Sequence, residues 1–251
     1  MHIDMKIFKK KKALVLIAGI IMAGAAAAAV ILTRDGMPKL EINGTGIGRE
    51  EYLQAVKSVQ FDVKAYFRST YGAETGGDFW TGEYGGEIPY QKLADEAIDL
   101  LKYRHAVYDT AEEKGYIQKE EASYTSIVNR MEEENLARKE KKENGEAVYG
   151  LTEYSLDQYL DYEMSSFRES YINDSENKDM EVSEEELLSY YENGGAIVGE
   201  DGETLPLDET KAALINQIRQ NRYEEMIQDR VEDSGVTADM DKLYAFTLNH
   251  I

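Results

Sequence analysis

A run of 20 uncharged residues, Ala13 to Leu32, constrains this chain more than any other feature of its sequence. As an α-helix it would be about 30 Å long, which is the thickness of the hydrocarbon layer of a bilayer. Five lysines lie among the twelve residues before it, so the positive-inside rule would place the amino terminus in the cytoplasm. A cleaved signal peptide is the alternative, although its apolar core usually spans only about 7–15 residues.

The sequence therefore predicts three parts. Residues 1–12 would form a cytoplasmic basic stub, residues 13–32 a transmembrane anchor or an uncleaved signal, and residues 33–251 an extracytoplasmic body. The expected location is a cell membrane crossed once, with the body outside.

Composition excludes several classes of function. The 251-residue chain has no cysteine, so it can form no disulfide and carry no lipid on a thiol. Its formal net charge is −21, and a body this acidic would repel the phosphates of a nucleic acid. Only three prolines occur, which favours a helical fold. We therefore expect no nucleic-acid partner.

Apolar side chains recur at steps of three and four residues along most of the body. The pattern predicts helices at about 49–70, 90–114, 119–144, 155–171, 183–193 and 208–234. The segment 119–144 is strongly charged, and its apolar stripe is narrow. It is therefore interpreted as a solvated face or as an arm that projects from the body.

Two short strands are expected near the ends of the body. The first is Leu40 to Asn43, and the second is Tyr244 to Leu248. Neither is stable alone, so the two are predicted to pair and to bring the last helix against the first. The expected fold class is mainly α, with a transmembrane helix followed by a helical domain that holds this terminal strand pair.

No residue pattern indicates catalysis or metal binding. The run GTGIG at 44–48 has Arg49 where a dinucleotide-binding loop needs its third glycine. The acidic run 174–179 has Lys178 at a ligand position and lacks the glycine of an EF-hand loop. The histidines His2, His105 and His250 lack the spacing of a zinc site. We expect no catalytic residue, no metal and no cofactor.

Three aromatic residues are the candidates for peptide binding. Phe79, Trp80 and Tyr84 lie in a glycine-rich loop at 71–87 and not on a helix face. Exposed aromatic side chains on such a loop suit weak contact with apolar peptide segments. The alternative is that the loop folds back and that Trp80 fills the core.

Several stretches of the body stand in an order that resembles a known family. They are LEINGTGIGREEYLQAV, DFWTGEYGG, YQKLADEAIDLLKYRHAVYDTAEEKGY, EENLARKEKKENGEAVYGLTEYSLDQYLDYEM, VSEEELLSYYENG and LPLDETKAALINQIRQNRYEEMIQDRVEDSGV. Together, over about 35–251, they resemble the chaperone module of the SurA/PrsA family of extracytoplasmic foldases, and the second stretch is similar to a loop of Gram-positive members. The resemblance implies a SurA-N-like helical chaperone domain. Many members also carry a parvulin-type prolyl isomerase domain between the last two stretches, where this chain has only the loop 194–206.

Three hypotheses about function remain open at this point. The resemblance implies a membrane-anchored holdase that assists unfolded or partly folded exported polypeptides and has no isomerase domain. The first alternative is a non-catalytic adaptor or structural subunit that binds one dedicated partner in the membrane or cell envelope. The second is a peptidyl-prolyl isomerase, which the missing domain argues against. The oligomeric state is left open.

Overall fold

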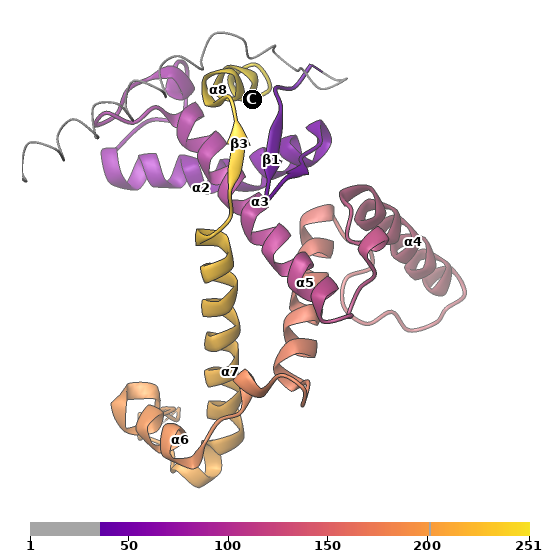
Figure 1. Cartoon of the computed structure of the whole chain (residues 1–251), viewed down its shortest axis with the longest axis vertical. Helices are drawn as coiled ribbons and strands as arrows, with labels where there is room; N and C mark the ends of the chain where they lie inside the picture. The colour runs from indigo at the N-terminus through magenta and orange to yellow at the C-terminus, as the bar shows by residue number, and fades with distance from the viewer. Residues whose placement is uncertain (1–35, 201) are drawn as a thin grey trace, which may run out of the picture.

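The computed structural model describes residues 36–200 and 202–251 and is mainly helical. A body at one end contains α2, α3, α8 and a small sheet, and two helical extensions run from it (Figure 1). One extension holds α4 and α5. The other is the long helix α7, with α6 against its distant end.

The body is built on two antiparallel helices that pack along each other, α2 (Arg49–Tyr71) and α3 (Pro89–Glu113). Their facing apolar side chains form the largest buried cluster of the described chain, which includes Tyr52, Phe67 and Leu101. A left-handed Gly72 ends α2. The loop that follows contains one turn of 3₁₀ helix, η1 (Phe79–Thr81), before Pro89 begins α3.

A three-stranded antiparallel sheet joins the two ends of the described chain. Its order is β2 (Thr45–Gly46), β1 (Leu40–Ile42) and β3 (Val236–Ala238). Leu40 pairs with Ala238, and Ile42 pairs with Val236. Asn43 adopts a left-handed φ of 49° in the turn between β1 and β2. Its side-chain Oδ1 also accepts a hydrogen bond from the Gly235 amide at 2.9 Å, which fixes β3 beside β1.

The predicted strand partner was wrong. Residues 240–248 form a helix, α8 (Met240–Leu248), and β3 takes the place beside β1. Leu243, Phe246 and Thr247 are buried at helical spacing, and Asp239 caps the helix by accepting the Lys242 amide. The Thr247 hydroxyl lies 2.6 Å from the Tyr52 hydroxyl, so α8 is fixed on α2.

In the described part of the chain, four further helices lie outside the body: α4 (Tyr124–Glu143), α5 (Leu156–Asn173), α6 (Glu184–Tyr190) and α7 (Leu207–Glu232). Short helical turns precede or follow them at η2 (Lys119–Glu121), η3 (Lys178–Met180) and η4 (Tyr191–Gly195). A serine hydroxyl caps each of α4, α5 and α6, at Ser123, Ser155 and Ser183 respectively. The predicted helix start at Ser183 is thereby confirmed.

The loop 194–206 closes on itself as a short hairpin. Val198 pairs with Thr204, and the Leu205 amide donates to the Ile197 carbonyl at 2.8 Å. The Tyr191 hydroxyl donates to the Leu205 carbonyl at 2.9 Å. The segment is therefore a compact connection between α6 and α7. Its interpretation as the insertion point of a further domain stays a prediction.

The predicted fold class and location, a single-pass membrane protein, need correction. Among residues 36–200 and 202–251, no helix combines the length and the apolar composition that crossing a bilayer requires. The segment 13–32, where the anchor was predicted, lies outside the described residues. The helical domain described here also carries a three-stranded sheet in place of a terminal strand pair.

One carboxyl group in the body gives a pH-dependent expectation. Asp95 on α3 accepts a hydrogen bond from the Tyr244 hydroxyl at 2.8 Å, and burial raises its pKa. A raised carboxyl pKa means that the ionised form destabilises the fold, so this contribution to stability is lost as pH rises through the folded pKa. Asp95→Asn should therefore stabilise the protein at pH 7, by less than about 1 kcal/mol because the group is only half-buried.

The gain from Asp95→Asn should shrink as the pH falls through the carboxyl range, where the wild-type side chain becomes neutral. Urea unfolding at pH 7 and at mildly acidic pH measures both values. A gain that stays constant with pH would contradict the assignment. Asp241→Asn, on the exposed face of α8, is the matched control.

Candidate protein-binding surface

The helices α4 and α5 form an arm, defined here as residues 124–173, that reaches away from the body (Figure 1). Its small core packs Ile127, Tyr159 and Leu160 against Tyr108 of α3. Ile127 is the one fully buried side chain of α4, because the rest of that helix is charged and solvated. Of the two alternatives for 119–144, a solvated face or a projecting arm, the structure shows a charged helix that forms an arm together with α5.

The tip of the arm, defined as residues 135–154, is held by specific polar contacts. The Asn135 side chain donates to the Tyr154 carbonyl at 2.9 Å and accepts from the Tyr154 amide at 2.7 Å. Arg138 donates to the carbonyls of Tyr149 and Leu151 at 3.0 and 2.7 Å. Its guanidinium also lies 4.7 Å from the centre of the Tyr154 ring. These contacts hold the connection between α4 and α5 in one conformation.

Large apolar side chains gather at this tip and are left in solvent. Of nine exposed large apolar side chains in the part of the chain that the structure describes, three belong to the tip, Leu136, Tyr149 and Leu151, and a fourth, Tyr162, lies further along the arm on α5. Leu136 is 59% exposed and Tyr149 is 86% exposed. A group of exposed apolar residues on a rigid support is typical of a protein-binding surface, because solvation of such a group is unfavourable.

A groove of about 470 Å³ lies along the same tip. It is lined by Asn135, Leu136, Lys139, Lys142, Thr152 and Glu153. Within residues 36–200 and 202–251, neither Lys139 nor Lys142 forms an ion pair, although the chain as a whole is strongly acidic. The groove thus offers two cations beside an apolar side chain to a partner.

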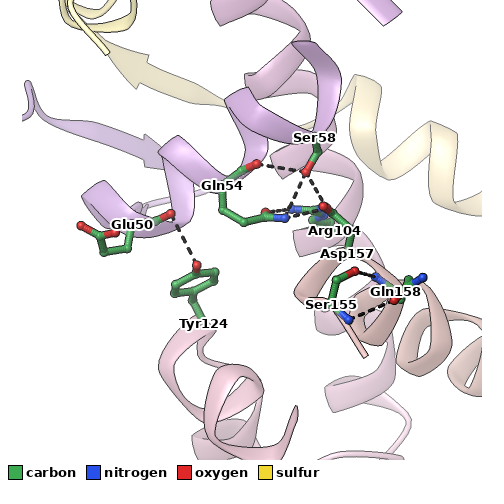
Figure 2. Close-up of polar contacts among 8 residues, drawn as sticks. All are labelled: Glu50, Gln54, Ser58, Arg104, Tyr124, Ser155, Asp157 and Gln158. Carbon is green, nitrogen blue, oxygen red and sulfur yellow. Dashed lines mark hydrogen bonds and ion pairs between the residues drawn. The ribbon is translucent and has the colours of Figure 1, made fainter. Parts of the chain in front are cut away.

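A half-buried polar joint connects the arm to the body, and we define it as Gln54, Ser58, Arg104 and Asp157 (Figure 2). Arg104 is its buried member, whereas the Asp157 side chain is 47% exposed. The Asp157 Oδ1 atom accepts from Gln54 at 2.6 Å, from Ser58 at 2.5 Å and from Arg104 at 3.2 Å. Arg104, only 8% exposed, also donates to the Gln54 side chain. Burial lowers the pKa of the Arg104 guanidinium, and the Asp157 carboxylate opposes this change.

Two smaller contacts support the joint (Figure 2). The Tyr124 hydroxyl at the start of α4 donates to the Glu50 carbonyl of α2 at 3.4 Å. Ser155 and Gln158 form a capping box at the start of α5, which places Asp157 in its first turn. The arm is therefore attached to α2 and α3 through the first turns of both of its helices, and the end of α5 also packs on α7, where the ring centres of Tyr171 and Tyr223 lie 5.3 Å apart.

A second polar cluster crosses the base of the arm. Glu163 of α5 accepts two hydrogen bonds from Arg130 of α4, at 2.9 and 2.8 Å, and one from the Tyr108 hydroxyl of α3, at 2.6 Å. Burial and the nearby Glu163 carboxylate raise the pKa of Tyr108. The Tyr108 hydroxyl therefore stays protonated and donates its hydrogen bond to Glu163. The Glu163 carboxylate thus connects α3, α4 and α5.

The polar joint can be tested by one substitution. Asp157→Ala should lower the free energy of unfolding by about 1–3 kcal/mol, because it leaves the buried Arg104 without its anionic acceptor. It should also speed amide hydrogen exchange at the start of α5, where the arm would separate locally from the body. Glu169→Ala, at an exposed position further along α5, is the control. Equal effects of the two substitutions would contradict the proposed joint.

The comparisons with known proteins identify the family. No protein-family model matches the chain. The chain is 38% identical, over 219 residues, to a chaperone for lacto-N-biosidase from Bifidobacterium longum subsp. longum, and the match covers 86% of this chain and 77% of the relative. The chain belongs to the family of this chaperone. The resemblance to SurA/PrsA foldases was therefore wrong.

A comparison of structures found the GH136 lacto-N-biosidase from Eubacterium ramulus, as native protein and as selenomethionine derivative. The sequence identity is 15% and the TM-score is 0.45, over 59% of this chain and 30% of that one. The matched part of this chaperone-family member therefore spans 30% of the length of that enzyme.

The three aromatic candidates from the loop 71–87 lie together against the body of this family member. Phe79 is buried, and its ring contacts Phe67, Trp80 and Tyr84, with centroids 4.9–6.0 Å apart. Trp80 and Tyr84 are partly buried and pack against the main core. The structure thus brings the three residues together, though as one packed aromatic cluster. A peptide-binding role for them stays a prediction.

The histidines of the described chain serve local contacts. His105 Nε2 lies 3.0 Å from Glu51 Oε1, and His250 Nδ1 lies 2.7 Å from the Phe246 carbonyl. His2 lies outside the described residues. Among residues 36–200 and 202–251, no group of three or more histidine, aspartate or glutamate side chains is placed to hold a metal ion.

The exposed residues of the arm tip were not among the candidates from the sequence. The connection at 144–155 contains Val148, Tyr149, Leu151 and Tyr154 and lies between two predicted helices. Large apolar residues in a segment with no helical face to bury them are the signal that could have indicated this surface.

Proposed function

We propose that this chain is a dedicated chaperone for a glycoside hydrolase of the lacto-N-biosidase type. The observation that carries the proposal is the 38% identity over 219 residues to a protein with that role, extending through 86% of this chain. The proposal favours one dedicated protein partner over a broad set of unfolded exported polypeptides.

The geometry of the arm supports a dedicated partner. General holdases need mobile, adaptable apolar surfaces, because their clients differ in shape. Here Asn135 and Arg138 hold the arm tip, and the polar joint holds the base. A preorganised surface loses little conformational entropy on binding, and it discriminates between shapes. We infer that Leu136, Tyr149 and Leu151 contact a specific surface of the client while that enzyme folds.

The acidic composition supports the same proposal. A net charge of −21 keeps a complex between the chaperone and a partly folded client soluble, because such complexes repel one another. The apolar side chains of the arm tip would then be free to bind the client without promoting aggregation.

Co-expression tests the proposed function. A lacto-N-biosidase-type enzyme is produced with the full chain, without it, and with an unrelated soluble protein at equal level. We expect the full chain to raise the specific lacto-N-biosidase activity of the soluble fraction by more than about tenfold, since refolding yield depends on capturing an aggregation-prone intermediate. An unrelated aggregation-prone enzyme, heated with the purified chain, should gain no protection. An equal gain for the lacto-N-biosidase-type enzyme and for the unrelated enzyme, or no gain for either, would overturn the proposal.

A further inference from the structure

The outer face of α2 carries a stripe of cations that interrupts the acidity of the chain. Lys57, Phe61, Lys64 and Arg68 follow one another at steps of four, three and four residues. Residues at these steps share one face of a helix, so the four side chains form a continuous row. We call this row the α2 stripe.

The side chains of the α2 stripe are available to a partner. Phe61 is 76% exposed, the largest exposure of any phenylalanine in the described chain, and Lys57 and Arg68 are exposed as well. Within residues 36–200 and 202–251, none of the three cations forms an ion pair, whereas most other lysines and arginines near the body do. Their charge is therefore not neutralised within the protein.

Trp80 borders the α2 stripe. The Lys64 ammonium lies 5.2 Å from the centre of the Trp80 ring, which is partly buried beside Phe79. Lys64 therefore stands between two aromatic rings, Phe61 one turn before it on the helix and Trp80 on the loop. The nearest acidic residue on α2, Asp62, lines the neighbouring groove with Lys92 and Glu96 and so lies on another face.

Such a row fits a partner of complementary chemistry. Three cations around an exposed phenylalanine suit a surface that presents carboxylates around an apolar side chain. The rest of this chain is acidic and would repel an anionic partner, so the α2 stripe would also orient the encounter. An anionic membrane is disfavoured because the whole body would approach a surface of its own charge.

We propose that the α2 stripe docks an acidic segment of the client enzyme that carries an apolar side chain, and that this contact is separate from the one at the arm tip. The client contributes aspartate or glutamate side chains opposite Lys57, Lys64 and Arg68, and an apolar side chain against Phe61. The partner in this inference rests on the proposed function, since the client is taken to be the lacto-N-biosidase-type enzyme.

The single tryptophan of the chain provides a direct test. Full-length protein containing 5-fluorotryptophan gives one ¹⁹F resonance, from Trp80 beneath Lys64. The unlabelled client is titrated in, and complex formation is followed in parallel by gel filtration. We expect the Trp80 resonance to shift or broaden as the complex forms, and we expect high salt to weaken binding.

Charge reversal gives the matched variants. Lys57→Glu, Lys64→Glu and Arg68→Glu combined should raise the dissociation constant by more than tenfold and reduce its dependence on salt. Phe61→Ala alone should raise it about fivefold. The control reverses three exposed lysines elsewhere, at Lys119, Lys178 and Lys242, for the same change in net charge. Circular dichroism confirms that each variant is folded.

Four outcomes decide the inference. A resonance shift with loss of affinity in the stripe variant alone supports it. A complex that leaves the Trp80 resonance unchanged, or equal weakening in the control, overturns the inference and leaves the proposed function intact. A response to anionic phospholipid vesicles that equals or exceeds the response to the client overturns it in favour of a lipid partner. Absence of any complex overturns the proposed function and this inference with it.

Discussion

Replacing Glu163 with alanine is expected to lower the free energy of unfolding by about 3–5 kcal/mol, the usual cost of removing one partner from a buried ion pair. The carboxylate is nearly enclosed and accepts hydrogen bonds from Arg130 on both of its oxygens. Its loss would remove the acceptor of two Arg130 N–H groups and of the buried Tyr108 hydroxyl, and Arg130 would keep only the Glu121 carbonyl. Urea denaturation followed by circular dichroism measures the change.

The same substitution should also change which part of the protein unfolds first. Because Glu163 joins α3, α4 and α5, amide hydrogen exchange should accelerate throughout residues 124–173 more than in the body. Glu181→Ala is the control, since its ion pair with Lys178 is exposed and should contribute less than about 1 kcal/mol. A cost for Glu163→Ala as small as that of the control would show that solvent replaces the lost contacts.

The second large effect concerns client rescue. Combining Leu136→Asp, Tyr149→Ala and Leu151→Asp should reduce the recovery of active lacto-N-biosidase-type enzyme by at least about tenfold, the loss that a few central interface residues usually produce. The three side chains are exposed, so the stability of the chaperone itself should change by no more than about 0.5 kcal/mol. Co-expression and soluble activity measure the first quantity, and urea unfolding measures the second.

Two exposed apolar residues away from the arm provide the control for this variant. Leu188→Asp and Val198→Asp remove apolar surface near α6 and the hairpin beside it. Rescue should remain at the wild-type level in this control. If both variants rescue equally well, the arm tip is not the contact surface. If both fail, binding depends on total exposed apolar surface and not on the arm.

Much of the helical framework could be predicted from local signals. The helix over 49–70 was expected from its apolar face and is found at Arg49–Tyr71, where Gly72 in a left-handed conformation ends it. The start at Ser183 follows from one hydroxyl accepting an amide three residues later. These signals act over a few residues, so the sequence contains all that determines them.

The prediction failed where two local patterns compete. The residues from Leu243 to Leu248 alternate well enough to suggest a strand, yet Leu243, Phe246 and Thr247 also stand at helical spacing. Contacts with distant residues determine that the segment is a helix. Val236 to Ala238 pair with β1 in its place, and the Thr247 hydroxyl lies within hydrogen-bond distance of the Tyr52 hydroxyl. Short apolar segments are ambiguous in this way whenever their partners lie far along the chain.

The exposed apolar surface of the arm tip also depends on contacts between segments far apart in the sequence. The sequence left two alternatives for the aromatic residues at 79–84, a binding loop or a loop folded back on the core, and in the folded chain Phe67 of α2 covers Phe79. Tyr149, in contrast, looks like one residue of a polar connection and is left in solvent. Whether a side chain is exposed depends on which other segments of the chain cover it, so the pattern within one segment does not predict its exposure.

By itself, the sequence indicated most of the helices between residues 49 and 234, the helix start at Ser183, an acidity that disfavours a nucleic-acid partner and the charged character of α4. Only the tertiary structure decided that α4 and α5 become an arm, because this depends on Arg104 meeting Asp157 and on Arg130 meeting Glu163. It also decided which apolar side chains remain in solvent. A buried charge is tolerated only when its partner arrives from another part of the chain, so the contacts that position the proposed binding surface exist only in the folded protein.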